Sequence, residues 1–578
     1  METKPIYVLY GSETGTAEEL SERLYRNLIR LGYRVVTLPM DEFDTQKLIE
    51  PLLCVFVCST TGQGEMPLNM RKFWKFLLKK RLPMNLLDDM QYAVFGCGDT
   101  SYVRYNWASK KLDSRLRQLG AQSFCPRGEG DEQHPQGVEG GFAFWCTHLS
   151  SALATVKTPS QPALRDSENI PPSYSIIRSG NTHELTEQPQ HTRGAIPSTL
   201  QENNRITADK HWQDVRKVGL SLPSSVSWKP GDIAVLYPWN DDESVHSFLR
   251  CLKWDSFADD LVFITSNIPE RKNPWLPNPL TVFNFVKYVI SIHSVPNRTF
   301  FEYAAHFTND DLHKERLLEF ASLEGLDDYY DYVTRPRRTL LETLQEFHSV
   351  HIPFEYALDA LPVIRGRQYS IANRCNQSEG KLELLIALVK YQTILKEPRQ
   401  GICSRWLAHL HQGIHFNIEI LPGFLSLPYT LDRPLIGVGP GTGVAPLRCL
   451  IQERVNLEIK NNVLFFGCRK ESMDYLLRED WEYHKNAGNL QLYCAFSRDQ
   501  EKKVYVQHKI QEYEEMIYHT LREEGGMVCV CGSSGSMPNA VRDAIAGIIS
   551  KFAGESISEG YEFLKKLEKE RRFFQETW

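Results

Sequence analysis

The sequence predicts a multidomain α/β protein, and three stretches of the 578-residue chain carry that prediction. Residues 5–150 alternate strand-like apolar segments with amphipathic helices, which is typical of a doubly wound parallel sheet. Residues 174–430 change to strands interrupted by helical insertions. Residues 434–446 run from an apolar strand through a glycine-rich turn into a helix, an arrangement that binds anions at the helix N-terminus.

These patterns divide the chain into three predicted domains and one linker. The first domain is expected at 1–150, followed by a linker at 151–173 that contains Pro and Ser and lacks hydrophobic periodicity. The second domain is expected at 174–430 with a mostly helical insert at about 241–360. The third is expected at 431–578.

Composition excludes several classes of protein. A formal net charge of −6 gives no overall basic footprint for nucleic acid. No apolar run reaches the roughly 18 residues of a membrane span, and no signal peptide is visible. The 13 cysteines are scattered without CxxC spacing, so we expect no zinc or other metal site and reduced thiols inside the cell.

The first strand of the first domain ends in a loop of hydroxyl residues and glycine without Lys or Arg. Such a loop suits a phosphomonoester held by N–H and hydroxyl donors at a helix N-terminus. It departs from the GxxxxGK[ST] pattern, which disfavours a nucleoside triphosphatase. This loop contains Ser12, Glu13, Thr14, Gly15, Thr16 and Ala17.

Two further loops at strand ends would flank a flat ring, with Tyr102 offering a stacking face. Each loop alone is compatible with an ordinary turn, but three at successive strand ends favour a ligand site. The second loop contributes Ser59, Thr60, Thr61 and Gly62, and the third contributes Cys97, Gly98, Asp99, Thr100, Ser101, Tyr102, Val103, Arg104, Tyr105 and Asn106. Asp131 and Glu132 close the site from another strand end.

The motifs SETGTA, STTGQG and GCGDTSYVRYN resemble the three ligand loops of the flavodoxin family. The resemblance implies that the first loop binds the phosphate of FMN and that the second and third surround its isoalloxazine ring. Asp131 and Glu132 would then lie near the ring or the ribityl chain.

The second domain contains a strand and a helix start that together suit a pyrophosphate. Arg367, Gln368, Tyr369 and Ser370 form a predicted strand, and Gly401, Ile402, Cys403 and Ser404 precede a helix. An arginine and a helix N-terminus are complementary to a pyrophosphate, and Tyr369 offers a plane for a second flavin. An RxYS strand is weak evidence alone; its place upstream of the glycine-rich turn strengthens it.

The third domain carries the pattern of a nicotinamide-nucleotide site. The turn at 439–443 suits a pyrophosphate, and 495–507 combine hydroxyls, cations and an aromatic ring suited to a 2′-phosphate and an adenine. A further strand at 527–532 ends in another turn before a helix. The sequence therefore predicts a site for the phosphorylated dinucleotide.

RGRQYS, GICS, GPGTG, SR…KVYVQ and CG…SM follow the order found in the ferredoxin–NADP reductase family, and the helical insert resembles that of diflavin reductases. The resemblance implies a barrel that binds FAD, followed by a domain that binds NADPH. FAD would contact Arg337, Arg367, Gln368, Tyr369, Ser370, Gly401, Ile402, Cys403 and Ser404. NADPH would contact Thr442, Ser497, Arg498, Lys503, Val504, Tyr505, Val506, Gln507 and Cys531.

The same resemblance implies a constellation for hydride transfer. Ser370 and Cys531 would position the nicotinamide, and the terminal Trp578 would lie over the FAD ring. The family usually adds an aspartate near the C-terminus, and we expect Glu562 at that position.

The compact length, LKEPRQGICSRWLA, KKVYVQHKI and the terminal ETW most resemble the small cytosolic NADPH-dependent diflavin reductases. The resemblance implies electron flow from NADPH through FAD and FMN to an anamorsin-type iron–sulfur protein in cytosolic iron–sulfur cluster assembly. Two alternatives remain: a soluble reductase for a haem protein, and a flavodoxin-fold scaffold without cofactors.

Overall fold

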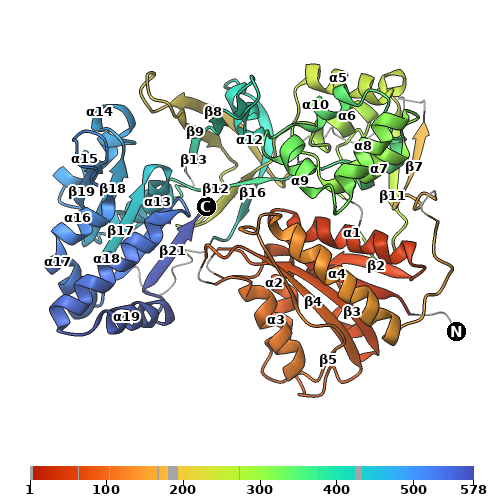
Figure 1. The fold of residues 1–578 in the computed structure, drawn as a ribbon. Helices are drawn as coiled ribbons and strands as arrows, with labels where there is room; N and C mark the ends of the chain where they lie inside the picture. The colour runs from red at the N-terminus through yellow and green to blue at the C-terminus, as the bar shows by residue number, and fades with distance from the viewer. Residues whose placement is uncertain are drawn as a thin grey trace. The chain divides into compact units, whose positions relative to one another are not determined.

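The computed structural model describes residues 4–62, 64–102, 104–165, 168–179, 193–272, 274–376, 378–423 and 432–578. The chain forms two compact units, each made of two separate stretches (Figure 1). The first unit comprises Met1–His191 and Asn240–Ile364, and the second comprises Thr192–Trp239 and Arg365–Trp578.

The first unit begins with a parallel sheet in the order β2-β1-β3-β4-β5, with β6 also pairing with β4. This order is that of a flavodoxin-like doubly wound sheet, as predicted. Its strands are β1 (Ile6–Gly11), β2 (Val35–Pro39), β3 (Leu52–Ser59), β4 (Met90–Gly98), β5 (Gln122–Ser123) and β6 (Gly128–Asp131).

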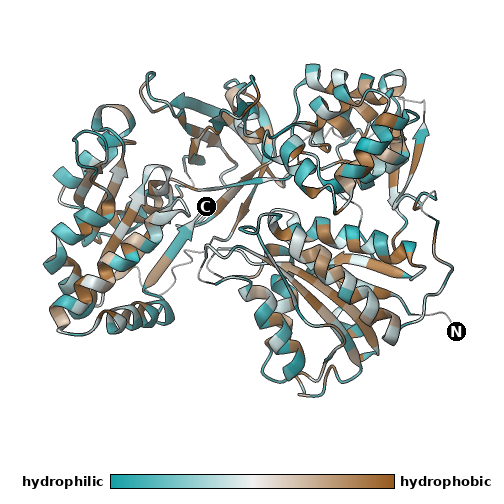
Figure 2. Cartoon of the chain, in the orientation of Figure 1, coloured by the Kyte–Doolittle hydropathy of each residue, from teal (hydrophilic) through white to brown (hydrophobic). Residues whose placement is uncertain are grey.

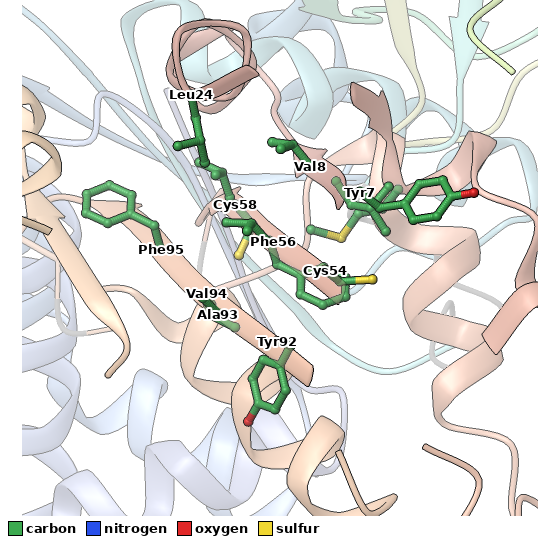
Figure 3. Close-up of a cluster of buried hydrophobic side chains, with 14 of the residues drawn as sticks. Tyr7, Val8, Leu24, Cys54, Phe56, Cys58, Tyr92, Ala93, Val94 and Phe95 are labelled. Carbon is green, nitrogen blue, oxygen red and sulfur yellow. The ribbon is translucent and has the colours of Figure 1, made fainter. Parts of the chain in front are cut away.

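Helices cover both faces of this sheet, so its central strands are continuously apolar. The connection from β1 to β2 runs toward one edge of the sheet, and the connections from β3 to β4 and from β4 to β5 run toward the other edge. Because such crossovers are right-handed, the helices in these two sets of connections lie on opposite faces of the sheet. The helices are α1 (Thr16–Arg30), α2 (Arg71–Leu77), α3 (Trp107–Gln118) and α4 (Gly137–Val156). Figure 3 shows Val8, Cys54, Phe56 and Val94 in the apolar core of this part of the first unit.

Helix α4 runs through Val156, so the predicted start of the linker at 151 falls inside a helix. Leu149 and Leu153 are buried, and this packing extends the helix beyond the predicted boundary. The chain then follows α1: the N–H groups of Ser160 and Gln161 donate to the carbonyl of Gly32.

The rest of the first unit is the helical insert, joined to a two-stranded antiparallel ribbon of β7 (Tyr174–Ser179) and β11 (Leu261–Ser266). The insert has its own apolar core, built around Phe285, Phe300 and Phe320. Its helices are α5 (Asp242–Leu252), α6 (Val282–Tyr288), α7 (Arg298–His306), α8 (Asp311–Ala321), α9 (Leu326–Tyr329), α10 (Leu340–Glu346) and α11 (Ala357–Ala360). The mostly helical stretch expected at about 241–360 is therefore present.

The second unit contains an antiparallel sheet in the order β12-β10-β16-β8-β9-β13. The edge strands nearly meet, because Ile371, next to β12, forms an isolated bridge with Leu384 of β13. The sheet is thus a nearly closed barrel. Its strands are β8 (Ile196–Arg205), β9 (Val215–Ser221), β10 (Ile233–Leu236), β12 (Arg367–Ser370), β13 (Lys381–Ala387) and β16 (His415–Leu421), with helix α12 (Ile402–Ala408) after β13.

The same unit ends in a parallel sheet in the order β19-β18-β17-β20-β21. Its strands are β17 (Leu435–Pro440), β18 (Asn462–Cys468), β19 (Gln491–Phe496), β20 (Met527–Gly532) and β21 (Phe573–Thr577). The helices used below are α13 (Val444–Asn456), α15 (Arg478–Asn486), α16 (Val506–Glu512), α18 (Ser536–Ala553) and α19 (Ile557–Lys569).

Candidate functional site

The first loop of the flavodoxin-like sheet joins β1 to α1. Gly15 has a left-handed backbone, with φ +110°, directly before the helix, a conformation that glycine adopts without strain. The Gly15 N–H donates to the Ser12 hydroxyl at 3.0 Å, and the Ser12 N–H donates to Oδ1 of Asn69 at 2.8 Å. Thr14 and Thr16 are exposed at the rim. The loop therefore offers hydroxyls and helix N-terminal N–H groups, which fit the phosphate of FMN.

Two side chains of this predicted loop have partners within the domain. Ala17 is fully buried in the core of the domain. The Glu13 carboxylate accepts a hydrogen bond from the Leu68 N–H at 2.8 Å, so it anchors the neighbouring chain. Their presence in the motif is explained by packing and by loop anchoring.

The second and third loops are joined to each other and to β6. The Thr60 N–H donates to the carbonyl of Cys97 at 3.1 Å, and its hydroxyl accepts from the Ala108 N–H at 3.2 Å. Asn106, with φ 52°, donates from Nδ2 to the Gly130 carbonyl at 3.2 Å. The structure thus brings these predicted residues to one edge of the sheet, together with Ser59, Thr61, Gly62, Gly98, Asp99, Ser101, Tyr102, Arg104 and Tyr105. Val103 lies outside the described residues.

Asp131 holds the third loop in place. Its carboxylate accepts from the Thr100 N–H at 2.9 Å and from the Thr100 hydroxyl at 2.8 Å. Desolvation raises its pKa, but these bonds and one from the Gln133 N–H outweigh it and lower the pKa. Desolvation and Asp99 raise the pKa of neighbouring Glu132, whereas the guanidinium of Arg337 acts to lower it.

Arg337 was predicted to contact FAD together with the barrel residues. It lies in the helical insert, where its backbone is left-handed with φ 56° and its side chain is exposed. The structure places it in the electrostatic neighbourhood of Glu132, within the first unit.

The barrel carries the predicted second flavin site. Strand β12 presents Arg367, Gln368, Tyr369 and Ser370, and it pairs with β10. The hydroxyl of Ser404 accepts from the Val389 N–H at 2.9 Å, which ties the start of α12 to the chain just after β13. Burial and neighbouring Cys403 raise the pKa of Tyr369, so its phenol stays protonated. An arginine, a phenol and the N–H groups after Gly401 and Ile402 fit the donors that a flavin diphosphate requires.

The glycine-rich turn between β17 and α13 is shaped by close approach. A Cβ on Gly443 would lie 2.2 Å from the Cys531 carbonyl oxygen of β20, so only glycine fits there. Gly441 has φ 57°, and a Cβ on it would meet nothing within 4 Å. The turn that contains Thr442 thus packs tightly on one side and is open on the other, as a pyrophosphate site requires.

The cations predicted for the 2′-phosphate follow two paired strands. Cys468 of β18 pairs with Phe496 of β19, so Arg469 and Ser497 emerge side by side. The Arg498 N–H donates to the Arg469 carbonyl at 2.8 Å. Sequence reasoning did not single out Arg469, whose guanidinium lies 4.3 Å from the ring centroid of Trp212. The sequence feature that could have pointed to Arg469 is its position directly after an apolar strand.

The segment at 503–507 splits by side-chain direction. Lys503 and Tyr505 are exposed, whereas Val506 is buried and Val504 packs against the same apolar core. Gln507 is the second residue of α16, which begins at Val506. The two valines can contribute only backbone groups to a nucleotide site.

Ser370, Cys531 and Glu576 converge in the second unit. The Ser370 hydroxyl donates to Oε1 of Glu576 at 3.2 Å. Cys531 of β20 pairs in register with Glu576 of β21, so their side chains lie on one face of the sheet. Burial and the Glu576 carboxylate raise the pKa of Cys531, which keeps its thiol protonated.

Glu562 does not belong to this group, contrary to the expectation. It lies on α19, is exposed, and pairs with Lys565 at 2.6 Å on the same helix. The turn after α19 and the pairing of β21 with β20 instead bring Glu576 to the site. The sequence feature that could have pointed to Glu576 is its position two residues before the terminal tryptophan.

The C-terminal residue is fixed by its backbone. The Trp578 N–H donates to the Gly532 carbonyl at 3.1 Å, and its carbonyl accepts from the Ser534 N–H at 3.1 Å. Trp578 is 52% exposed. The backbone of Trp578 is anchored, and the residue is exposed at the end of β21, the strand next to Cys531 on β20. This arrangement suits an indole that covers the nicotinamide position and can move away from it.

A buried charge network joins the barrel to the nucleotide domain. Arg448 of α13 donates to the carboxylates of Glu383 and Asp480, both at 2.7 Å, and to the Ala372 carbonyl at 3.0 Å. Burial acts to raise the pKa of Glu383, but Arg448 and Lys381 prevail and lower it to about 2. The network fixes the chain two residues after Ser370.

Three family models match separate parts of the chain. They are flavodoxin at residues 8–145, the FAD binding domain at 188–406, and the oxidoreductase NAD-binding domain at 438–543. They confirm the predicted fold class. Among the described residues, no helix has the length and apolar character needed to cross a membrane.

Curated relatives match along the whole chain. The protein named NADPH-dependent diflavin oxidoreductase 1 of Schizosaccharomyces pombe is 64% identical, with 100% of both chains covered. Those of Danio rerio and Mus musculus are each 38% identical, covering 99% and 100% of both chains respectively. The chain therefore belongs to the family of NADPH-dependent diflavin oxidoreductases.

Proposed function

We propose that the chain passes electrons from NADPH through FAD and FMN to a one-electron protein acceptor. The observation that carries the proposal is the hydrogen bond from Ser370 to Glu576 beside Cys531. Ser370 lies on the barrel strand that carries the predicted FAD residues, and the other two lie on the nucleotide domain. A site for hydride transfer needs this meeting of flavin and nucleotide elements.

When bound, NADPH supplies a hydride, FAD accepts it, and FMN releases electrons singly. The Ser370 hydroxyl and the Cys531 thiol orient the nicotinamide, and the Glu576 carboxylate holds the hydroxyl by accepting its hydrogen bond. The Trp578 indole shields the site and must move aside when nicotinamide enters. Positioning of the reacting atoms, more than acid–base strength, then supplies most of the acceleration.

The proposed acceptor is an anamorsin-type iron–sulfur protein of cytosolic iron–sulfur cluster assembly, and the proposed location is the cytoplasm. The support is the resemblance of LKEPRQGICSRWLA, KKVYVQHKI and the ETW terminus to the small cytosolic diflavin reductases. A haem protein is the alternative acceptor.

The test begins with the absorption spectrum of the purified full chain, which should show about one FMN and one FAD. NADPH should then bleach the oxidised flavins, and adding an anamorsin-type protein should restore them as its cluster is reduced. A colourless protein would support the scaffold alternative. Reduction of a haem protein but not of the iron–sulfur protein would show that the acceptor is the alternative one, a haem protein.

A further inference from the structure

The flavodoxin-like sheet carries a concentrated positive charge although the whole chain is negative. Residues 66–87 contain six Lys or Arg and no Asp or Glu, and residues 104–118 contain five Lys or Arg and one acid, Asp113. That acid is buried and pairs with Arg127 and Arg117. Charge of one sign gathered in two segments, against a net charge of −6, marks a localised field.

The two segments are neighbours in the fold. Helices α2 and α3 lie on the same face of the sheet (Figure 1), and Nε of Arg115 on α3 donates to the Leu77 carbonyl at the end of α2 at 2.8 Å. Figure 2 shows the brown strands of the sheet with hydrophilic residues on the helices around them. We call this surface the basic face; its exposed cations are Lys72, Lys75, Lys79, Lys80, Arg81, Arg104, Lys111 and Arg117.

Most of this charge has no counter-charge among the residues that the structure describes. Among the described residues, no carboxylate pairs with Lys72, Lys75, Lys80 or Arg81, and Lys79 lies only over the Phe76 ring, at 4.8 Å. Five adjacent uncompensated cations repel one another, which costs stability unless a partner uses them. The basic face therefore suits an anionic partner.

The basic face borders the predicted FMN loops directly. Nζ of Lys111 donates to the Gly64 carbonyl at 3.5 Å, and a Cβ on Gly64 would lie 2.7 Å from Cδ of Arg104. Helix α3 starts at Trp107, immediately after the third loop. Arg104 and Lys111 thus lie beside the loops, whereas the chain after α2 leads toward the opposite edge of the sheet, where β4 begins. A protein large enough to cover the face from the end of α2 to the start of α3 would reach the ring edge from which an electron must leave.

Exposed apolar side chains lie among the cations. Met84 is 82% exposed and Leu78 is 50% exposed, both just after α2, and Trp107 is 41% exposed at the start of α3. Apolar anchors surrounded by charge are typical of a protein interface. Phosphate groups of a nucleic acid or a lipid surface would use the charge without placing a redox centre at the loops.

We propose that the basic face docks an acidic protein electron acceptor, whose carboxylates meet the cations of α2 and α3. This inference rests on the proposed function, because it assumes that electrons leave at the FMN loops. The expected partner is a redox protein with an acidic surface around its own redox centre.

Two redox proteins of opposite charge test the proposal on the full-length flavin-loaded chain. Acidic cytochrome b5 and basic cytochrome c are reduced at increasing ionic strength, and uncharged menadione measures the flavins without docking. Cytochrome b5 reduction should slow as salt rises, because screening removes the attraction. At low salt, Lys72→Glu with Lys75→Glu should lower kcat/KM for cytochrome b5 about tenfold, within the range of electrostatic steering.

The matched control is Lys566→Glu with Lys569→Glu on α19, which has the same spacing, exposure and change of net charge. It should leave cytochrome b5 reduction near the wild-type rate, and Lys72→Arg with Lys75→Arg should do the same. Equal losses in both Glu variants, or no loss in either, would overturn the proposal. A loss only of binding to phosphatidylserine vesicles or RNA would assign the face to lipid or nucleic acid instead. If the wild-type protein fails even with menadione, the proposed function has failed, not the docking surface.

Discussion

At the scale of single residues, the carboxylate beside Ser370 determines how firmly its hydroxyl is held. Oε1 of Glu576 accepts a hydrogen bond from the Ser370 hydroxyl at 3.2 Å, and Glu576 lies in register with Cys531. A charged acceptor holds a hydroxyl more strongly than a neutral one does. The longer side chain of glutamate, compared with the aspartate expected for the family, reaches Ser370 from β21.

Glu576→Gln should therefore slow FAD reduction by NADPH about ten- to a hundredfold. A hydrogen bond to a charged group contributes about 1.5–3 kcal/mol, and each 1.4 kcal/mol changes a rate tenfold. Stopped-flow absorbance of the flavin measures that rate. Glu562→Gln is the matched control and should not change it, since Glu562 is exposed on α19. An unchanged rate in Glu576→Gln would remove Glu576 from the proposed mechanism.

Arg498 should select the phosphorylated nucleotide. Its N–H bonds the Arg469 carbonyl, so the side chain starts at the paired ends of β18 and β19, and it is exposed there. Losing one charge-assisted hydrogen bond to the 2′-phosphate costs about 1.5–3 kcal/mol, or about ten- to a hundredfold in affinity. Arg498→Ala should raise the KM for NADPH by that factor and leave NADH turnover nearly unchanged. Steady-state kinetics with both nucleotides decide the matter: equal losses would mean that Arg498 is structural.

At the scale of elements, the parts predictable from sequence were those with local signals. Glycine and hydroxyl residues mark strand ends whatever the distant chain does, so the loop at Gly15 and the turn at Gly441 were recognised. Glu576 depended on which strand lies next to β20, a long-range pairing that periodicity does not contain. The half-buried Val504 and the buried Val506 were included with their exposed neighbours because a motif does not show side-chain direction.

The network around Arg448 links the barrel strand β13 to helices α13 and α15, and it should make stability depend on pH. The folded pKa of Glu383 is about 2, below its ordinary value of about 4.3, so the carboxylate stabilises the fold above the unfolded pKa. That contribution, on the order of 3 kcal/mol, is lost as pH falls from about 5 towards 2.

Glu383→Gln should therefore lower the melting temperature at pH 7 and flatten the decline of the melting temperature below pH 5. Differential scanning calorimetry of the full chain at several pH values measures both effects. Exposed Glu379→Gln serves as the control and should leave the profile unchanged. A parallel decline in Glu383→Gln and wild type would show that other carboxylates govern the acid limb.

At the scale of the whole molecule, electron transfer requires the FMN loops to approach two partners in turn, FAD and an external acceptor. A tether of roughly 20 residues spans about 25 Å, taking 5–6 Å times the square root of its length. The segment after α4 begins at 157, and part of it is bonded to Gly32 at the end of α1. These bonds hold the first part of the segment against the flavodoxin-like sheet's own helix α1, which shortens the stretch that can act as a tether.

Removing about ten residues between 157 and 173 should leave hydride transfer to FAD intact, because its predicted residues are C-terminal to the deletion. Reduction of a protein acceptor should fall severalfold, and reduction of a dye that takes electrons from FAD should change little. Single-turnover FAD reduction and acceptor turnover measure the two steps. Full acceptor turnover in the shortened protein would show that the segment is only a spacer.

The interleaving of the two units along the chain also has a consequence for biosynthesis. Barrel strand β10 ends at Leu236, but its partner β12 begins at Arg367 and β16 ends at Leu421. At roughly 5–20 residues per second, a ribosome needs about 10–40 s to supply the chain from the end of β10 to the end of β16. During that time β8 and β9 can pair only with each other, and β10 waits for both of its partners. The flavodoxin-like sheet, complete in sequence by Val156, is free to fold first. Protease resistance of the barrel on ribosome-bound chains should appear only after residue 421 has emerged, and earlier protection would mean that a chaperone or a non-native pairing covers the waiting strands.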